Sequence, residues 1–177
     1  AKNIKAKAVI VTTGGYGASK EILAKYRPDL KDYVTTNSKG TTGDGIALVE
    51  KLGGQIIDMD KVQIHPTVNQ EKGILIGEAV RGEGAILVDD EGNRFVNEMD
   101  TRDKVSAAIN ALPKKRAYLI FDQGVRSRAT AIEFYAKQGY VKEGKTVADL
   151  AKTIKVPKAN LEKAVANWNK AVESKQD

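Results

Sequence analysis

The hydrophobic pattern changes at about residue 62, and this change limits the possible folds more than any other feature of the sequence. A β-branched run over residues 6–13 is followed by a glycine pair and by residues 18–26, which can form a helix. This order predicts a buried strand, a tight turn and a helix, as in an α/β unit. Beyond residue 62, short strands and longer helices follow each other in the order typical of an α+β fold. We therefore expect a partial α/β segment over residues 1–61 and an α+β unit over residues 62–177.

Local signals set further boundaries in the first segment. Ser19 is a possible N-cap of the first helix, and Arg27-Pro28 can end it. The polar residues 35–45 have the composition of a loop. Residues 46–52 space their apolar side chains as a helix does, and the glycine pair after them can close it. Residues 55–59 are predicted to form a second strand.

In the second segment, turn residues and prolines separate the elements. Strands over residues 85–88 and 94–96 flank Asp89-Asp90-Glu91-Gly92-Asn93, a hairpin signal. Residues 101–112 read as a helix that Pro113 stops, and residues 117–122 as a strand.

The rest of the chain, from about residue 128, is predicted to be helical. Residues 145–154 form one expected helix and residues 157–174 another, with Pro157 in the first turn of the latter. The apolar stripe of the last helix consists of Leu161, Val165, Trp168 and Val172.

Composition excludes several classes of protein. The 177 residues contain no cysteine, which rules out disulfide scaffolds, cysteine-ligated metals and thiol catalysis within this chain. A single histidine argues against a nitrogen-rich metal site, so we expect no metal. No apolar run approaches the roughly 20 residues that span a bilayer. No signal peptide is visible at the start of this sequence, so we expect a soluble protein, in the cytoplasm or alternatively the periplasm.

The net charge is +6, from 29 Lys and Arg against 23 Asp and Glu. The lysines are scattered among acidic residues, and the one compact basic run, Lys114-Lys115-Arg116, is typical of a solvated turn. We therefore expect no nucleic-acid partner.

Two glycine-containing turns in the first segment are candidate cofactor contacts. Gly14-Gly15 can be a simple tight turn, because its spacing differs from the fingerprint that binds a pyrophosphate. Asp44 lies between two glycines at the start of a predicted helix. It can cap that helix, or it can lie against the phosphate or ribose of a cofactor.

Charged side chains gather after residue 62. Glu78 and Arg81 share one helix face if residues 78–81 are helical. Arg102 stands at the start of a helix, where acidic residues are favoured, which makes it a candidate anion binder; a surface ion pair is the alternative. His65 is either a structural residue or a hydrogen-bond donor to a substrate carboxylate.

Four motifs occur in a fixed order, together with two glycine-containing segments before them. The motifs are residues 63–67 (QIHPT), 78–82 (EAVRG), 92–98 (GNRFVNE) and 101–103 (TRD), and the segments are 9–15 (VIVTTGG) and 42–45 (TGDG). In this combination the chain resembles the flavoprotein subunit family of fumarate reductase and succinate dehydrogenase. The resemblance covers nearly the whole chain and is greatest to the soluble single-chain and flavocytochrome c fumarate reductases.

The resemblance implies a fold and a reaction. Residues 1–61 would be part of the FAD-binding domain. Residues 62–177 would be the mobile capping, or clamp, domain, which closes over the flavin domain and encloses the substrate. A hydride would pass from FAD N5 to one alkene carbon of fumarate, and a proton to the other.

The resemblance also implies roles for single residues. Arg102 matches the proton donor, and Arg81 and Glu78 match the relay that reprotonates it. His65, Gly77 and Glu78 match substrate-binding positions. Gly14, Gly15 and Asp44 match positions near FAD. A free guanidinium is a very weak acid, so Arg102 can donate a proton only where burial disfavours its charge, and we expect these charges to be buried.

Departures from the family pattern leave alternatives open. Gly77 stands where flavocytochrome relatives have a threonine, and it could offer a substrate carboxylate only its backbone N–H. Urocanate, methacrylate or another enoate is therefore an alternative substrate. Relatives such as L-aspartate oxidase or a ketosteroid dehydrogenase, or a non-catalytic α+β binding module, are further alternatives.

The sequence contains no Gly-x-Gly-x-x-Gly. We therefore expect it to be a fragment that on its own binds FAD weakly or not at all and reduces nothing.

Overall fold

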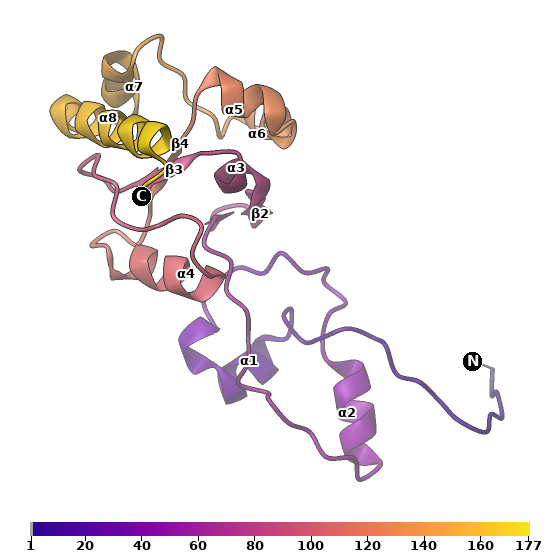
Figure 1. Ribbon diagram of the computed structural model, residues 1–177. Coiled ribbons are helices and arrows are strands. Elements are labelled where there is room, and N and C mark those ends of the chain that lie inside the picture. The colour runs from indigo at the N-terminus through magenta and orange to yellow at the C-terminus, as the bar shows by residue number, and fades with distance from the viewer. Residues whose placement is uncertain (1) are drawn as a thin grey trace. The chain divides into compact units, whose positions relative to one another are not determined.

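The computed structural model describes residues 2–177, which divide into two compact units (Figure 1). The first unit consists of the residues up to 63 together with 70–74. The second consists of residues 64–69 and 75–177.

Three short helices make up the regular structure described in the first unit. These are α1 (Lys20–Tyr26), the 3-10 helix η1 (Pro28–Leu30) and α2 (Asp44–Lys51). The Oγ atom of Ser19 accepts a hydrogen bond from the backbone N–H of Ile22 at 3.2 Å, which confirms Ser19 as the N-cap of α1. Leu23 of α1 and Leu30 of η1 are buried, and these two helices pack against each other.

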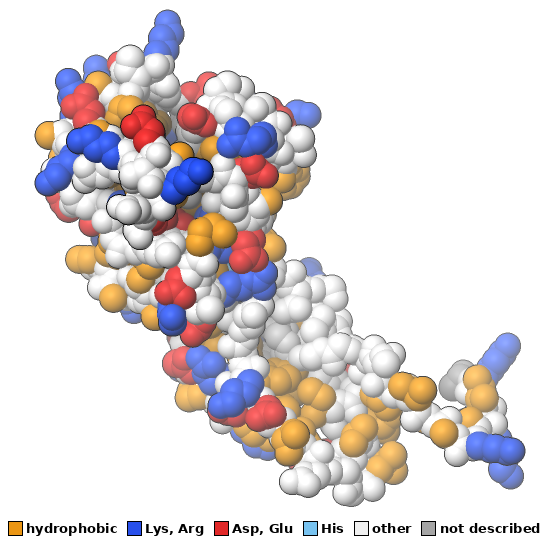
Figure 2. Space-filling model, in the orientation of Figure 1, with side chains coloured by type: hydrophobic (Ala, Val, Ile, Leu, Met, Phe, Trp, Pro, Cys, Tyr) orange, Lys and Arg blue, Asp and Glu red, His pale blue; other side chains and the backbone are white. Residues whose placement is uncertain are grey.

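The prediction of a strand over residues 6–13 is wrong for this structure. Figure 1 shows the segment next to the N-terminus as an irregular coil, and Val9 and Ile10 are 80% and 87% exposed. The apolar side chains of this coil are visible in Figure 2. A strand needs a neighbour for its N–H and C=O groups, and among residues 2–177 none pairs with this segment. Residues 55–59 form no strand for the same reason.

The second unit combines short strands with longer helices. Its first strand is β1 (Val68–Asn69), which pairs with β2 (Ile74–Leu75) at the boundary of the two units. The elements that follow are α3 (Ala79–Gly82), β3 (Ile86–Val88), α4 (Arg102–Ala111), β4 (Tyr118–Ile120), α5 (Gln123–Arg128), α6 (Ala131–Lys137), α7 (Val147–Ile154) and α8 (Lys158–Ser174). This mixture of helices with small sheets agrees with the expected α+β class.

Strand β3 is the centre of the second unit. It pairs antiparallel with β4, so that Ile86 lies opposite Ile120. Because successive side chains of a strand point to opposite faces, Ile86 and Val88 pack against α7 and α8, while Leu87 packs against α4. All three β3 side chains are buried. The helices are thereby fixed on both faces of a two-stranded sheet (Figure 1).

The expected hairpin between residues 85–88 and 94–96 is reduced to one bridge, between Val88 and Arg94. The loop itself closes as expected, with the N–H of Asp89 donating to the carbonyl of Asn93 at 3.0 Å. Phe95 and Val96 leave the ladder because they pack with Leu87 in the core.

The helical character predicted from about residue 128 is confirmed by α6, α7 and α8, with an irregular segment between α6 and α7. Gly139, at φ +80°, follows α6, and the chain runs irregularly to Thr146. A Cβ on Gly144 would lie 2.3 Å from the backbone nitrogen of Leu150, so a helical side chain would not fit there. Thr146 and Asp149 then form a capping box that starts α7.

The last helix follows its predicted stripe in part. Leu161 is buried, Val165 and Trp168 pack against the core, and Val172 is exposed. Pro157 occupies the N-cap of α8 instead of its first turn. Over the described residues, no helix is long and apolar enough to cross a membrane. On the face drawn in Figure 2, basic and acidic side chains of the second unit are interspersed.

Candidate active site

The structure brings Glu78, Arg81 and Arg102 together within the second unit. Glu78 is the N-cap residue of α3, and Arg102 is the first residue of α4. The Nη2 atom of Arg102 donates to Oε2 of Glu78 at 2.6 Å. The Nη2 atom of Arg81 lies 3.8 Å from Oε1 of the same carboxylate. Glu78 therefore lies between two guanidinium groups, an arrangement in which protons can pass along a chain of donors and acceptors.

Arg81 is buried, with its side chain only 1% exposed. Its Nη1 atom donates to the backbone carbonyl of Glu98 at 2.5 Å. Its Nε and Nη2 atoms have no hydrogen-bond partner among residues 2–177. Burial lowers the pKa of Arg81, while the nearby Glu78 carboxylate opposes that shift. Burying a guanidinium that is only partly paired lowers the stability of the fold. Buried charged groups with shifted pKa values occur often at functional sites.

The other two members of this group are more open than the sequence analysis expected. The side chain of Glu78 is 51% exposed and that of Arg102 is 37% exposed. The expectation of a fully buried charged chain is therefore wrong for these two residues and holds for Arg81. The hydrogen bond from Arg102 holds the pKa of Glu78 below its usual range, so this carboxylate is ionised at neutral pH.

His65 is held next to this group by the strand-like pairing of residues 67 and 76. The N–H of Ile76 donates to the carbonyl of Thr67 at 2.8 Å, and the Thr67 hydroxyl donates to the carbonyl of Ile76 at 2.7 Å. The N–H of Thr67 donates to Nδ1 of His65 at 3.3 Å, which leaves Nε2 to carry the proton of a neutral imidazole. Burial, and then the charges of Arg102 and Arg81, lower the pKa of His65.

Gly77 differs from its expected role. Its backbone N–H, which the sequence suggested as a contact for a substrate carboxylate, donates instead to the hydroxyl oxygen of Tyr135 at 2.9 Å. Tyr135 comes from α6 and was not a candidate on sequence grounds, because no motif surrounds it and its partner is far away in the sequence. Sequence reasoning therefore missed this contact.

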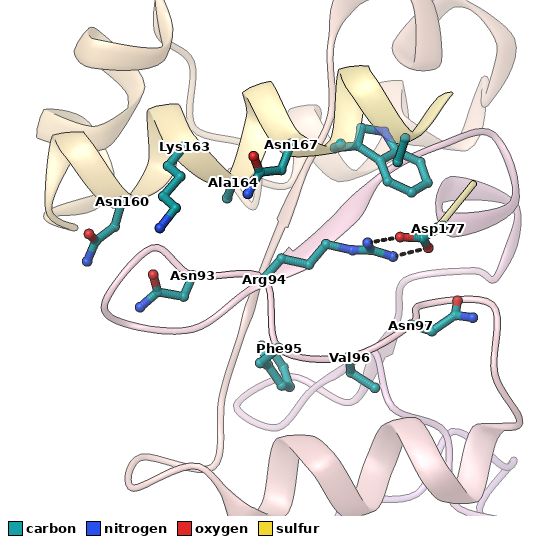
Figure 3. A pocket seen from close by; sticks show the side chains of 12 residues that line it. Asn93, Arg94, Phe95, Val96, Asn97, Asn160, Lys163, Ala164, Asn167 and Asp177 are labelled. Atoms are coloured by element: carbon teal, nitrogen blue, oxygen red, sulfur yellow. Dashed lines mark hydrogen bonds and ion pairs between the residues drawn. The ribbon is translucent and has the colours of Figure 1, made fainter. Parts of the chain in front are cut away.

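The buried carboxylate of Glu98 belongs to a hydrogen-bond network next to Arg81. The Oε1 atom of Glu98 accepts the N–H of Leu87 at 2.7 Å, and Oε2 accepts Nη2 of Arg94 at 2.8 Å. The guanidinium of Arg94 also lies over the ring of Trp168, 4.7 Å from its centroid. Arg94 pairs with Asp177 as well, as Figure 3 shows. Because the backbone carbonyl of Glu98 holds Arg81, this network fixes the position of that guanidinium.

The candidate cofactor residues lie together in the first unit. The N–H of Gly43 donates to the carbonyl of Gly15 at 3.1 Å, which places the Gly14-Gly15 turn beside the start of α2. Asp44 is the first residue of α2 and not its cap: the N-cap is Gly43, at φ 84°, and the Asp44 carboxylate accepts the hydroxyl of Thr42 at 2.7 Å.

These residues fit an FAD contact. A Cβ added to Gly14 or Gly15 would meet nothing within 4 Å, so their backbone presents an open surface. Asp44 is exposed beside this surface, where its carboxylate can accept hydrogen bonds from the hydroxyls of a cofactor. By contrast, Gly45 permits close packing within the chain, because a Cβ on this residue would lie 2.0 Å from the Oγ1 atom of Thr13. In the part of the chain described, no cluster of three or more metal-ligating side chains occurs.

Comparison with known proteins defines the class of this chain. Residues 1–177 match the family described as "FAD binding domain", so the chain belongs to this family of flavoproteins, whose cofactor is FAD. The predicted resemblance to fumarate reductases is confirmed by its relatives. It is 47% identical over 174 residues to the NADH:fumarate oxidoreductase of Klebsiella pneumoniae (strain 342), covering 98% of this chain and 19% of that protein.

A second relative and a solved structure extend the comparison. The urocanate reductase of Eggerthella lenta is 34% identical over 177 residues, covering 94% of this chain and 29% of that protein. The open conformation of a flavocytochrome c3 fumarate reductase matches with a TM-score of 0.75 and 42% identity, covering 93% of this chain and 29% of that one. The chain thus spans less than a third of the length of these relatives.

Proposed function

We propose that this chain is part of an FAD-dependent reductase that converts fumarate to succinate. Residues 62–177 act as the capping domain, and residues 1–61 contribute to the FAD-binding domain. The observation that carries the proposal is the carboxylate of Glu78 between the guanidinium groups of Arg102 and Arg81. A carboxylate between two guanidinium groups can pass protons, as expected where the protein supplies a proton and the cofactor supplies the electrons.

When bound, FAD would supply the hydride that one carbon of the alkene accepts. In the proposed reaction, the positive charge of Arg102 stabilises the negative charge that develops on the other carbon, and Arg102 becomes neutral when it gives its proton to that carbon. The neutral Arg102 then recovers a proton through Oε2 of Glu78, 2.6 Å from its Nη2 atom. Because the Glu78 carboxylate is ionised, the proton that it passes on comes from Arg81, whose pKa burial lowers below that of a free guanidinium, and Arg81 then regains a proton from solvent.

Substrate binding is proposed to use the groups around this relay. The Nε2–H of His65 can donate to one carboxylate, and Arg102 adds a positive charge beside it. Arg102 is 37% exposed, so the proposal requires the complete protein to exclude water from this site during the reaction. Gly14, Gly15 and Asp44 are proposed to contact FAD.

A second substrate class is supported by one observation. Gly77 has no side chain, and Tyr135 occupies its N–H, so residue 77 has no donor of its own for a carboxylate. A related enoate, such as urocanate or methacrylate, is therefore the alternative substrate of the same site.

The test is the reoxidation of the complete, chemically reduced flavoprotein under anaerobic conditions. Fumarate, urocanate and methacrylate are added separately, and the return of oxidised FAD is followed by absorbance. The proposal expects fast reoxidation by fumarate with formation of succinate. Fast reoxidation by another enoate alone would identify the alternative substrate, and reoxidation by none of them would contradict the proposed reaction.

A further inference from the structure

The hydroxyl of Tyr135 faces the backbone of Gly77 with its hydrogen unused. Tyr135 is only 8% exposed, and its oxygen accepts the N–H of Gly77 at 2.9 Å. Among residues 2–177, no hydrogen bond donated by this hydroxyl is found. Phenolic hydroxyls are donors as well as acceptors, and buried ones normally use both capacities. The Tyr135 hydrogen is thus available to an acceptor that comes from outside the chain.

Gly77 leaves space in front of this hydroxyl. A Cβ on residue 77 would lie 3.6 Å from the Tyr135 oxygen, so the atoms beyond Cβ of a larger side chain would compete for the same volume. The backbone at Gly77 does not require glycine, since this residue is absent from the glycines with positive φ. The main effect of glycine at position 77 is therefore to leave the space beside the Tyr135 hydroxyl free of a side chain.

Three consecutive residues, Ile76, Gly77 and Glu78, hold the polar groups of the site. The carbonyl of Ile76 accepts a hydrogen bond from the Thr67 hydroxyl, and the N–H of Thr67 donates to the ring of His65. Gly77 holds Tyr135, and Glu78 holds Arg102. An imidazole N–H, a hydroxyl and a guanidinium are the donors that recognise a carboxylate.

We propose that Tyr135 is a specificity-determining residue whose hydroxyl donates a hydrogen bond to a carboxylate of the substrate, in the space that Gly77 leaves open. This proposal rests on the proposed function, because it places the substrate beside His65 and Arg102. Tyr135 thereby supplies the donor that residue 77 lacks, and the site selects a substrate whose carboxylate reaches α6.

The test uses Tyr135→Phe in the complete flavoprotein, which removes the hydroxyl and keeps the ring. We expect KM for fumarate, and the dissociation constant of succinate measured from the FAD difference spectrum, each to rise by roughly tenfold or more. We expect kcat to change far less, because Arg102 and Glu78 are untouched. Tyr118→Phe, which removes the hydroxyl of a half-buried tyrosine on β4, is the matched control and should change neither constant.

A double variant separates this role from a structural one. Gly77→Thr alone should weaken succinate binding by crowding Tyr135, whereas Gly77→Thr with Tyr135→Phe should restore much of it, because a hydroxyl returns to the same space. Unchanged succinate binding in Tyr135→Phe would overturn the proposal, as would a fall confined to kcat with no rescue. If the wild-type protein binds succinate through Tyr135 but reduces no enoate, the proposed reaction fails and the carboxylate site stands. If the wild type binds no dicarboxylate, both proposals are wrong.

Discussion

The guanidinium of Arg102 donates a hydrogen bond of 2.6 Å to the carboxylate of Glu78, across 24 residues of sequence. Arg102 begins α4 and Glu78 precedes α3, so the packing of the second unit sets this distance. A carboxylate that also faces the buried Arg81 is well placed to return a proton to Arg102. The role of each residue in the proposed reaction can be tested separately.

Replacing Glu78 by Gln should slow turnover with little effect on FAD content. Gln keeps the size of the side chain but cannot carry the proton between the two guanidinium groups, and positioned acid–base groups contribute roughly 10²- to 10⁴-fold. We expect kcat of the complete flavoprotein to fall by about 10²-fold or more, measured by steady-state reduction of fumarate.

Glu83 offers a matched control for this variant. It is the C-cap residue of the same helix and pairs with Arg128 at 2.7 Å, outside the proposed relay. Glu83→Gln should leave kcat nearly unchanged. A Glu78→Gln enzyme that retains most of its turnover would remove Glu78 from the relay.

Removing the Glu98 carboxylate should destabilise the second unit. It accepts hydrogen bonds from the N–H of Leu87 and from Arg94, and both would be left without this buried partner. Loss of one partner from a buried pair costs about 3–5 kcal/mol. We expect Glu98→Ala to lower the midpoint of thermal unfolding clearly. In the exposed pair Lys158–Glu162, Glu162→Ala should cost at most about 1 kcal/mol. Equal effects of the two variants would contradict this prediction.

His65 should make the protein less stable as the pH falls. Burial and the positive charges of Arg102 and Arg81 lower the pKa of His65 below its ordinary value of 6.5. Above pH 6.5 the imidazole is neutral in both the folded and unfolded states and adds no pH dependence. Below it, the unfolded state takes up a proton first, so stability falls until the pH passes the folded pKa.

His65→Gln removes this titration, and the variant isolates its contribution. Thermal unfolding of the wild type and the variant between about pH 7.5 and 5 should show a larger loss for the wild type. An NMR titration, in which the variant identifies the His65 signal by its absence, should give a pKa below 6.5. A pKa above that value would contradict the described environment of the ring.

What the sequence predicts well here is local. The Ser19 cap of α1 depends on residues within one turn, and the helix starting at Arg102 has its boundary signals beside it. The strand expected over residues 6–13 is wrong because a strand depends on partners elsewhere, which the local pattern cannot supply. Likewise, the apolar pattern of β3 predicted a strand but not its pairing with β4.

For the candidate site, too, the sequence predicts local features and not the contacts made by packing. The motifs identify Glu78, Arg81 and Arg102, and the structure shows that they share one cluster. Tyr135 could not be found in this way, because 58 residues separate it from Gly77 and only the packing of α6 brings them together. The exposure of Glu78 and the burial of Arg81 are also set by packing, although the two residues are only three positions apart in the sequence.

The most direct test of the account is Arg102→Ala in the complete flavoprotein. The variant should contain FAD at the wild-type level, because Gly14, Gly15 and Asp44, the proposed FAD contacts, are unchanged. Arg116→Ala, at an exposed arginine paired with Asp90, is the control and should retain full activity. When the chemically reduced enzyme is mixed with fumarate, reoxidation of FAD and formation of succinate should fall by roughly 10⁴-fold or more, since both the proton and the stabilising charge are lost. Reoxidation at the wild-type rate would contradict the assignment of Arg102 as the proton donor.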